Sequence, residues 1–338
     1  DIDTRGFLLI RSFLSQEQIE MLREDFEAAS LEQNSNYSVR RMSVDALENL
    51  DRQCREVIQD VQEQSQVRVN LLNDGIFFAT FSEKSTLVKL RPGPQQFPWH
   101  QDHENYWMWQ DLKNYLNFYL PIVKPNREQS NLTLAPFDRF QERAPEVYQR
   151  LVGRGATRVY RSRVFRSGAA WMIKDDDRGG KVGKLDFDLA EIEETPLLEA
   201  GDLLLMRGDL IHRTQDSATR RIAASIRYIN GDTFIRRSSL VCGGWVKTLM
   251  MLNARYIFSP AIDCFEAFGA HGLRAAEIDR YLKDRNSRGD VSRPGKLAFL
   301  SRLANDRSRC REKRESSSGE GLKRVAGRWG VGRRLSGV

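Results

Sequence analysis

The chain has 338 residues, 40% of them apolar, which is enough for one large domain with appendages or for two modest domains. Its formal net charge is +7, but residues 307–338 contain ten Lys or Arg and three Glu, so the tail carries the whole excess and the rest of the chain is neutral. We therefore expect any nucleic-acid binding to be nonspecific and confined to the tail, and we expect no membrane span, because no run of about 18 apolar residues occurs.

The N-terminal part predicts one short strand followed by two helices. FLLI, at residues 7–10, is typical of a short buried strand. Ser15 and Gln18 form an S-x-x-Q capping box, which indicates the start of a helix. The apolar face of this helix consists of Ile19, Leu22 and Phe26. A second helix is expected over residues 43–63. Its apolar stripe consists of Val44, Leu47, Leu50, Cys54, Val57 and Val61.

From about Gly75 the pattern changes to short β-rich segments separated by Pro, Gly, Asn and Ser. The segments are IFFATF, STLVKLRPG, NYLNFYLPIV, NLTLAP, AGDLLLMRGDLIH and RIAASIRYI. Many short strands at fairly regular spacing favour an antiparallel sandwich or barrel. Residues 153–195 contain five arginines between positions 154 and 166, followed by the loop KDDDRGGKVGK. We interpret this stretch as an insertion between the two halves of the barrel that covers one mouth.

After Arg236 the strand pattern ends. We expect one domain over residues 1–236 and a mixed, partly helical extension over residues 237–306, in which AAEIDRYLKDR predicts a helix. Residues 307–338 are rich in Arg, Ser and Gly and have few apolar side chains to bury. A disordered tail is therefore predicted.

The cysteines and the start of the chain bear on the cellular compartment. Cys54, Cys242, Cys264 and Cys310 are far apart and form no C-x-x-C motif. This spacing argues against a disulfide framework and against a cysteine-based zinc site. The first residues also lack the basic and long apolar regions of a signal peptide. We therefore expect reduced thiols and a cytoplasmic protein.

The stretch WHQDHENYW, residues 99–107, contains two of the four histidines. Residues i and i+2 of a strand point to the same face, so His100 and Asp102 can offer an imidazole and a carboxylate to one point. A polar surface loop is the plain alternative, because H-x-D alone is a weak motif. In a barrel, His212 at the end of AGDLLLMRGDLIH would lie across from this pair, whereas His271 stands in a Gly-bounded loop. Two His and one carboxylate form the ligand set of non-haem Fe(II) oxygenases.

An arginine after the distal histidine would suit a 2-oxo acid co-substrate, because the distal carboxylate of such an acid needs a charged partner. An Arg fork binds a carboxylate bidentately. Arg221 and Ser225 share one face of the strand that follows His212, and Arg227 on that face could reach the same space. Arg220 faces the other way. We therefore predict that Arg221 binds the co-substrate, with Ser225 behind it.

At this point the sequence resembles the phytanoyl-CoA dioxygenase family of Fe(II)- and 2-oxoglutarate-dependent oxygenases, from Gly6 to about Tyr228. The resemblance is carried by GFLLIRSFLSQEQIEMLRE, WHQD, NFYLPIVKPNREQSNLTLAPFDRF, and GDLLLMRGDLIHRT with the Arg strand after it. Where the family usually has a Gly-rich return ending in P-G-S-H, this chain has APFDRF, so the loop is expected to differ there. The resemblance implies a mainly β fold with flanking helices around a double-stranded β-helix (jelly-roll, cupin-like) core.

The resemblance also implies a set of cofactors and contacts. Fe(II), 2-oxoglutarate and O2 would be the cofactor and co-substrates, with His100, Asp102 and His212 as the metal ligands. Tyr119, Asn117 and Thr214 would lie near 2-oxoglutarate, although ordinary barrel wall is the alternative for Tyr119 and Asn117.

Separate predictions concern Arg220 and His103. The loop between the distal histidine and Arg221 is somewhat short for the family, which leaves Arg220 as a rival partner of 2-oxoglutarate. His103 alternates away from the first ligand. We expect it to contact solvent or to support the ligands without binding metal.

The expected activity is hydroxylation, or another oxidation, of a small-molecule substrate with release of succinate and CO2. Asp102 argues against halogenation, because related halogenases lack this carboxylate. One alternative is a catalytically inactive barrel that only binds a ligand, but all three metal positions and the arginine are present. A protein- or nucleic-acid-directed oxygenase is another. The arginines of the insertion leave an anionic substrate open, although we favour a solvent-facing role for them. The oligomeric state is not predicted.

Overall fold

The computed structural model describes residues 2–29, 39–79, 97–162, 170–216, 218–288 and 294–308. The first half contains α1 (Ile2–Arg5), β1 (Phe7–Ile10), α2 (Gln16–Ala28), β2 (Val39–Arg41), α3 (Val44–Gln64), β3 (Leu71–Ala79), α4 (Glu104–Trp109), β4 (Tyr115–Val123), β5 (Leu132–Leu134), α5 (Phe137–Arg143), α6 (Pro145–Leu151) and β6 (Thr157–Ser162). The second half contains β7 (Ala170–Asp175), β8 (Lys181–Leu185), the 3-10 turn η1 (Leu189–Glu191), β9 (Leu203–Arg207), β10 (His212–Thr214), β11 (Ile222–Ile229), β12 (Phe234–Arg236), α7 (Arg237–Val241), α8 (Trp245–Asn253), α9 (Arg255–Ala267), β13 (Gly272–Arg274) and α10 (Ala275–Ser287).

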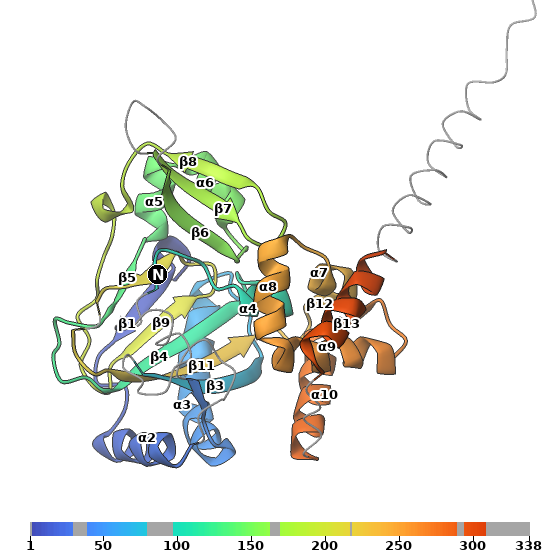
Figure 1. Cartoon of the computed structure of the whole chain (residues 1–338). Coiled ribbons are helices and arrows are strands. Elements are labelled where there is room, and N and C mark those ends of the chain that lie inside the picture. Colours follow the sequence, from blue (N-terminus) through green and yellow to red (C-terminus); the bar gives the residue numbers. More distant parts are fainter. Residues whose placement is uncertain are drawn as a thin grey trace, which may run out of the picture.

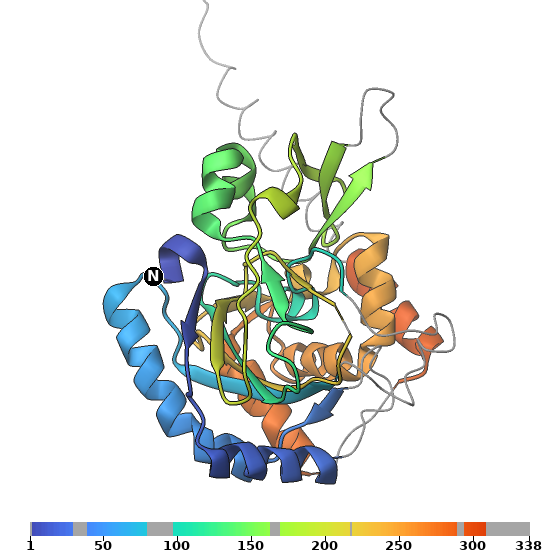
Figure 2. The same cartoon turned by 90° about the vertical axis from the view of Figure 1, so that its left-hand side faces the viewer.

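The larger sheet contains six antiparallel strands in the order β1-β9-β4-β11-β3-β2. Alternate residues of its central strands face opposite sides. Phe118 and Ile226 belong to the core between the sheet and the helices α2 and α3, which cover its outer face (Figures 1 and 2). Tyr119 and Ala223 belong to another cluster, on the inner face. The strands are therefore buried on both faces, and only the inner face can contribute to a site inside the barrel.

A second sheet faces the first across the barrel. Within it β10 pairs with β5, and the backbones of His100 and His212 exchange hydrogen bonds of 2.9 and 3.0 Å. His100 also bridges to Arg158 of β6, so β6, β7 and β8 continue the same sheet beyond the barrel (Figure 1). The stretch predicted as an insertion, residues 153–195, thus contains three strands of this sheet. The two facing sheets form the double-stranded β-helix core, which confirms the predicted fold class.

Several local predictions are confirmed. Ser15 Oγ accepts a hydrogen bond from Gln18 N at 3.2 Å, and Ser15 N donates to Gln18 Oε1 at 2.9 Å, which completes the capping box. The predicted apolar face of α2 is buried. In α3 the prediction for Val44 is wrong, because this side chain is 67% exposed. Val44 lies six residues before the buried Leu50, about 240° around the helix, so it points away from the stripe.

Other predictions need a boundary correction or cannot be assessed. β3 begins at Leu71, four residues before the predicted change of pattern, and β11 begins at Ile222. The segment STLVKLRPG and residues 309–338 of the predicted tail lie outside the described residues. The predicted domain boundaries remain predictions. In the part of the chain that the structure describes, no helix combines the length and apolar character that a membrane span requires.

The residues after Arg236 pack beside the barrel as a mainly helical unit. α10 confirms the helix predicted from AAEIDRYLKDR, whereas the short strand β13, which pairs with β12, was not expected. Trp107 and Trp109 of α4 share a hydrophobic cluster with Phe258 and Phe265 of α9. The two tryptophans thus join the extension to the segment that follows the H-x-D motif.

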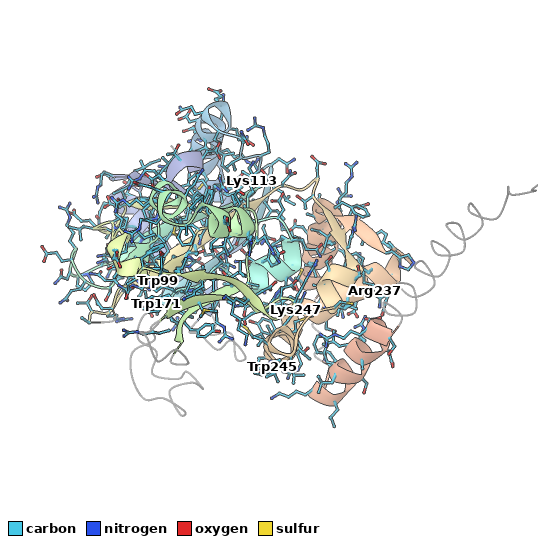
Figure 3. The ribbon with its side chains drawn as sticks, turned by 90° about the horizontal axis from the view of Figure 1, so that it is seen from above. Trp99, Lys113, Trp171, Arg237, Trp245 and Lys247 are labelled. Atoms are coloured by element: carbon cyan, nitrogen blue, oxygen red, sulfur yellow. The ribbon has the colours of Figure 1, made fainter. Side chains whose placement is uncertain are left out.

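A buried ion pair also joins the extension to the second sheet. Lys247 of α8 is fully buried, and its Nζ lies 2.7 Å from Asp177 Oδ1 and 2.6 Å from the Ser239 carbonyl oxygen (Figure 3). Asp177 follows β7, and its carbonyl oxygen accepts a hydrogen bond of 2.7 Å from Gly244 N. Burial lowers the pKa of Lys247, but Asp177 opposes this shift and stabilises the charged form.

Lys247→Met should lower the free energy of unfolding by about 3 kcal/mol, because the largely buried Asp177 then keeps only the exposed Arg178, whose Nε lies 3.7 Å away. The matched control is Arg23→Met on α2, whose side chain is 50% exposed beside the 49% exposed Glu20. Its effect should stay below about 1 kcal/mol. Urea denaturation of both variants measures the difference. Equal midpoints for the two variants would contradict a structural role of the Lys247 pair.

Candidate metal centre and co-substrate site

Three side chains point toward one place inside the barrel, next to the H-x-D segment and between the two sheets. The ligand atoms of His100, Asp102 and His212 lie within 4.8 Å of one another. The two imidazole rings are 4.4 Å apart, centroid to centroid, and His212 Nε2 lies 3.8 Å from Asp102 Oδ1. The antiparallel pairing of His100 with His212 produces this proximity, because it places the two backbones side by side. One ion can contact all three residues.

Both imidazoles are held in the orientation that a metal ligand needs. His100 Nδ1 lies 2.8 Å from the Pro98 carbonyl oxygen, and His212 Nδ1 lies 3.0 Å from the Leu210 carbonyl oxygen. A carbonyl only accepts, so each Nδ1 carries the proton and each Nε2 keeps a free lone pair. Burial and the neighbouring His212 lower the pKa of His100 to about 3. His100 is therefore neutral near pH 7, as metal binding requires.

The carboxylate of Asp102 is oriented as well. Asn105 Nδ2 donates to Asp102 Oδ2 at 3.0 Å, which leaves Oδ1 on the side of His212. Burial by itself would raise the pKa of Asp102, but His212, His100 and Arg227 together hold it below its usual value. The carboxylate is therefore ionised, as a metal ligand would need to be. Asn105 was not predicted, although it stands three residues after Asp102 at the start of a helix.

Asn105→Ala should weaken binding of a divalent metal by roughly 10- to 100-fold, because Asp102 then loses the group that orients it. Binding is measured by calorimetric titration with Ni(II), which does not turn over. Asn126→Ala serves as a control in a loop distant in sequence from the ligands, and it should bind Ni(II) like the unmodified chain. An unchanged affinity for Asn105→Ala would show that Asp102 needs no support from this amide.

His103 lies beside the ligands without belonging to them. It is buried, its ring stacks on that of His100 with centroids 6.3 Å apart, and its Nε2 lies 3.1 Å from Asp176 Oδ2. Arg158 binds both oxygens of Asp176, from Nε to Oδ2 and from Nη2 to Oδ1 at 3.0 Å. The supporting role predicted for His103 is therefore consistent with its contacts, whereas solvent contact is not. The sequence gives no signal for Asp176, because β6 and β7 bring it there from far along the chain.

The fourth histidine is excluded from the cluster. His271 is exposed and lies just before β13, where its carbonyl oxygen accepts a hydrogen bond from Arg237 N at 3.0 Å. It belongs to the C-terminal unit. The choice of His212 over His271 as partner of the H-x-D pair is thus consistent with the structure.

The predicted co-substrate residues lie around the start of β11. Arg221 immediately precedes the strand, is buried, and donates from Nη1 to the Ser130 carbonyl oxygen at 2.9 Å. Its guanidinium lies 5.6 Å from the centroid of the Tyr119 ring. Burial raises the pKa of Tyr119, and the Arg221 charge opposes the shift. Burial and the same charge lower the pKa of Lys124 to about 8. A partly desolvated cationic region of this kind favours an anion.

Arg220 has different surroundings. Its side chain is 62% exposed, and its guanidinium lies 3.8 Å from Glu27 Oε1 on α2. It therefore points to the outer face, as the alternation along the strand predicts. Of the two rivals, only Arg221 lies on the inner side.

The remaining predicted contacts are engaged within the protein. Ser225 Oγ donates to Asn117 Oδ1 at 2.7 Å across β11 and β4. Thr214 Oγ1 accepts from Phe97 N at 3.2 Å and keeps its own proton available. Asn117 and Thr214 therefore line the inner wall, while Ser225, which is fully buried, supports Asn117.

The chain matches one family model and is similar to several solved structures. Residues 2–223 match the sequence model of the family described as phytanoyl-CoA dioxygenase (PhyH). HygX from Streptomyces hygroscopicus, solved with nickel, 2-oxoglutarate and hygromycin B, is 13% identical with a TM-score of 0.39, over 68% of this chain and 84% of its own. EctD from S. alaskensis, solved with 2-oxoglutarate and 5-hydroxyectoine, is 13% identical with a TM-score of 0.42, over 69% of this chain and 75% of its own.

A third solved structure is the non-haem carbocyclase SnoK from nogalamycin biosynthesis, 12% identical with a TM-score of 0.41, over 68% of this chain and 82% of its own. No curated protein sequence matches the chain. The family match covers more than half of the chain. The molecule is thus an Fe(II)- and 2-oxoglutarate-dependent dioxygenase by class. The chain belongs to the phytanoyl-CoA dioxygenase family.

Proposed function

We propose that the enzyme hydroxylates a small-molecule substrate, with His100, Asp102 and His212 as the ligands of Fe(II). The observation that carries the proposal is the orientation of the three side chains toward one point, with both Nδ1 atoms already hydrogen-bonded to carbonyl groups. Two His and one carboxylate leave coordination positions open, and this is the donor set of non-haem Fe(II) oxygenases. The donor chemistry and the protonation of the ligands fit the metal.

Bound Fe(II) would supply the activation of O2, which would couple the oxidation of 2-oxoglutarate to succinate and CO2 with hydroxylation of the substrate. The protein binds and orients. Arg221, supported by Ser130, pairs with the distal carboxylate of 2-oxoglutarate, and the Tyr119 hydroxyl faces the same carboxylate. Asn117 and Thr214 line the wall beside it.

The apolar side chains of the inner face also contribute to the proposed function. Leu204, Met206 and Ala223 are buried next to Tyr119 between the two sheets. Their side chains keep water away from the co-substrate, which strengthens the ion pair with Arg221 and limits oxidation without substrate.

An anaerobic titration with Fe(II) and 2-oxoglutarate tests the proposal. The visible metal-to-ligand charge-transfer band of the chelate should appear with the unmodified chain and should be absent with Asp102→Ala. Under air, the unmodified chain should then convert 2-oxoglutarate to succinate slowly without substrate. A folded protein that binds Fe(II) but gives no band and no succinate would support the ligand-binding alternative.

A further inference from the structure

The inner face of the larger sheet carries a second tyrosine–arginine pair. Tyr119 and Arg221 form the first pair, at one end. Tyr115 lies four residues before Tyr119 on β4, and Arg227 lies six residues after Arg221, at the far end of β11. Six residues of strand span about 20 Å. A five-carbon acid held at the first pair therefore does not fill the second.

The Arg227 guanidinium is buried with few partners. Its side chain is 12% exposed, and its Nη1 lies 3.4 and 3.5 Å from the two carboxylate oxygens of Asp74, longer than an ordinary hydrogen bond. Its Nε has no acceptor among the residues that the structure describes. On one side the group lies 5.9 Å from the centroid of Phe78. An arginine has five N–H donors, so this group can still bind an acceptor.

Tyr115 adds a second donor at the same place. The residue is fully buried, and its hydroxyl has no hydrogen-bond partner within the described part of the chain. Burial raises the pKa of Tyr115 well above its usual value, and Arg227 is the strongest opposing influence. The hydroxyl is therefore a neutral donor close to the guanidinium. A buried hydroxyl without a partner is destabilising, and a ligand that accepts a hydrogen bond from it would remove this cost.

The second pair also faces the metal ligands. Arg227 is close enough to Asp102 for its charge to help hold the pKa of that carboxyl group below its usual value. Two of the arginines that the sequence offered for an anion are engaged elsewhere, since Arg154 lies 3.1 Å from Asp175 and Arg158 binds Asp176. Arg227 on β11, in contrast, has an Nε without an acceptor among the described residues.

We propose that Arg227 and Tyr115 bind an anionic oxygen group of the substrate, a carboxylate or a phosphate, and so position the substrate beside the metal centre. This inference rests on the proposed oxygenase function, because 2-oxoglutarate is taken to occupy the Arg221 end. A planar guanidinium and a neutral hydroxyl together match such a group. Asp74, which is 36% exposed, can turn toward water when the ligand arrives.

The test uses the full chain saturated with Ni(II) and 2-oxoglutarate, and calorimetric titration with benzoate, phenyl phosphate and the neutral benzamide. Binding of Ni(II) and 2-oxoglutarate is measured first. If this binding fails, the proposed function is wrong, and this result is separate from the test of the anion site. At least one anion should bind about tenfold or more tightly than benzamide. The stronger of the two anions identifies the source as a carboxylate or a phosphate. Equal binding of all three probes, or no binding, would overturn the proposal.

Substitutions test whether the anion binds at Arg227 and Tyr115. Arg227→Met should weaken binding of the preferred anion by about tenfold or more, whereas Arg274→Met, which removes an exposed arginine paired with Asp232, should leave it unchanged. Tyr115→Phe removes a hydroxyl without a described partner, so it should retain the fold and still weaken the anion several-fold. If Arg227→Met does not fold, Asp74→Asn tests the proposal instead. This substitution removes the negative charge beside Arg227, so anion binding should become tighter. Unchanged anion affinity in Tyr115→Phe and Asp74→Asn would show that Arg227 and Asp74 are only a structural ion pair.

Discussion

His212→Ala is expected to reduce Fe(II) affinity by at least about 100-fold and to abolish the charge-transfer band with 2-oxoglutarate. Loss of an orienting group alone costs metal sites 10- to 100-fold, and this variant removes a ligand. His212 is held in place by backbone hydrogen bonds to His100, which survive the substitution. Its side chain is 15% exposed and fills little of the core. The thermal unfolding midpoint of the metal-free protein should therefore stay close to that of the unmodified chain.

His271→Ala is the matched control, because it removes the same side chain from an exposed position outside the cluster. It should bind Fe(II) like the unmodified chain. Both variants are measured by anaerobic calorimetric titration, with Co(II) absorption as a second readout of coordination. Retention of the band in His212→Ala would mean that another group completes the site, and the assignment of the triad would then be wrong.

The convergence of the three candidate ligands is predictable because its signals are local. His100 and Asp102 are two residues apart, and alternation along a strand predicts that they share a direction. His212 follows a buried apolar strand and a tight turn, a pattern that the sequence shows, and it is the first residue of β10. The capping box at Ser15 is equally local, with donor and acceptor three residues apart. The burial prediction is wrong for Val44 because this residue lies at the end of a helix, where neighbouring residues no longer determine which side chains are buried.

The residues that support the candidate ligands are not predictable from the sequence, because their positions depend on which distant segments pack together. Asp176 reaches His103 only through the pairing of β6 with β7, and the sequence shows it as one acid in a run of three. Lys247 resembles any other helical lysine until the fold buries it against Asp177. Burial turns ordinary charged residues into specific partners, and burial is a property of the assembled sheets.

Arg221→Met is expected to weaken 2-oxoglutarate binding by about 2–5 kcal/mol, or roughly 30-fold or more, while Fe(II) binding stays unchanged. The carboxylate of the co-substrate would otherwise be left in a buried region without its cation, and this cost is typical of truncating one partner of such a pair. Methionine retains most of the volume of the side chain. Lys124 lies close enough for the Arg221 charge to lower its pKa, so some residual attraction for the anion should remain.

Arg220→Met is the matched control and separates the two rivals, because the residues are adjacent but face opposite sides of the sheet. Arg220 is 62% exposed beside Glu27, so its loss should change 2-oxoglutarate affinity less than twofold, roughly the limit expected of a surface pair. The measurement is a titration of the Fe(II)-loaded protein with 2-oxoglutarate in both variants and in Arg221→Lys. Lysine keeps the charge but not the fork, so an intermediate affinity is expected. If Arg220→Met were the weaker binder, the co-substrate would lie on a different face of β11, and the inner pairs built on Tyr119 and Tyr115 would need reassignment together.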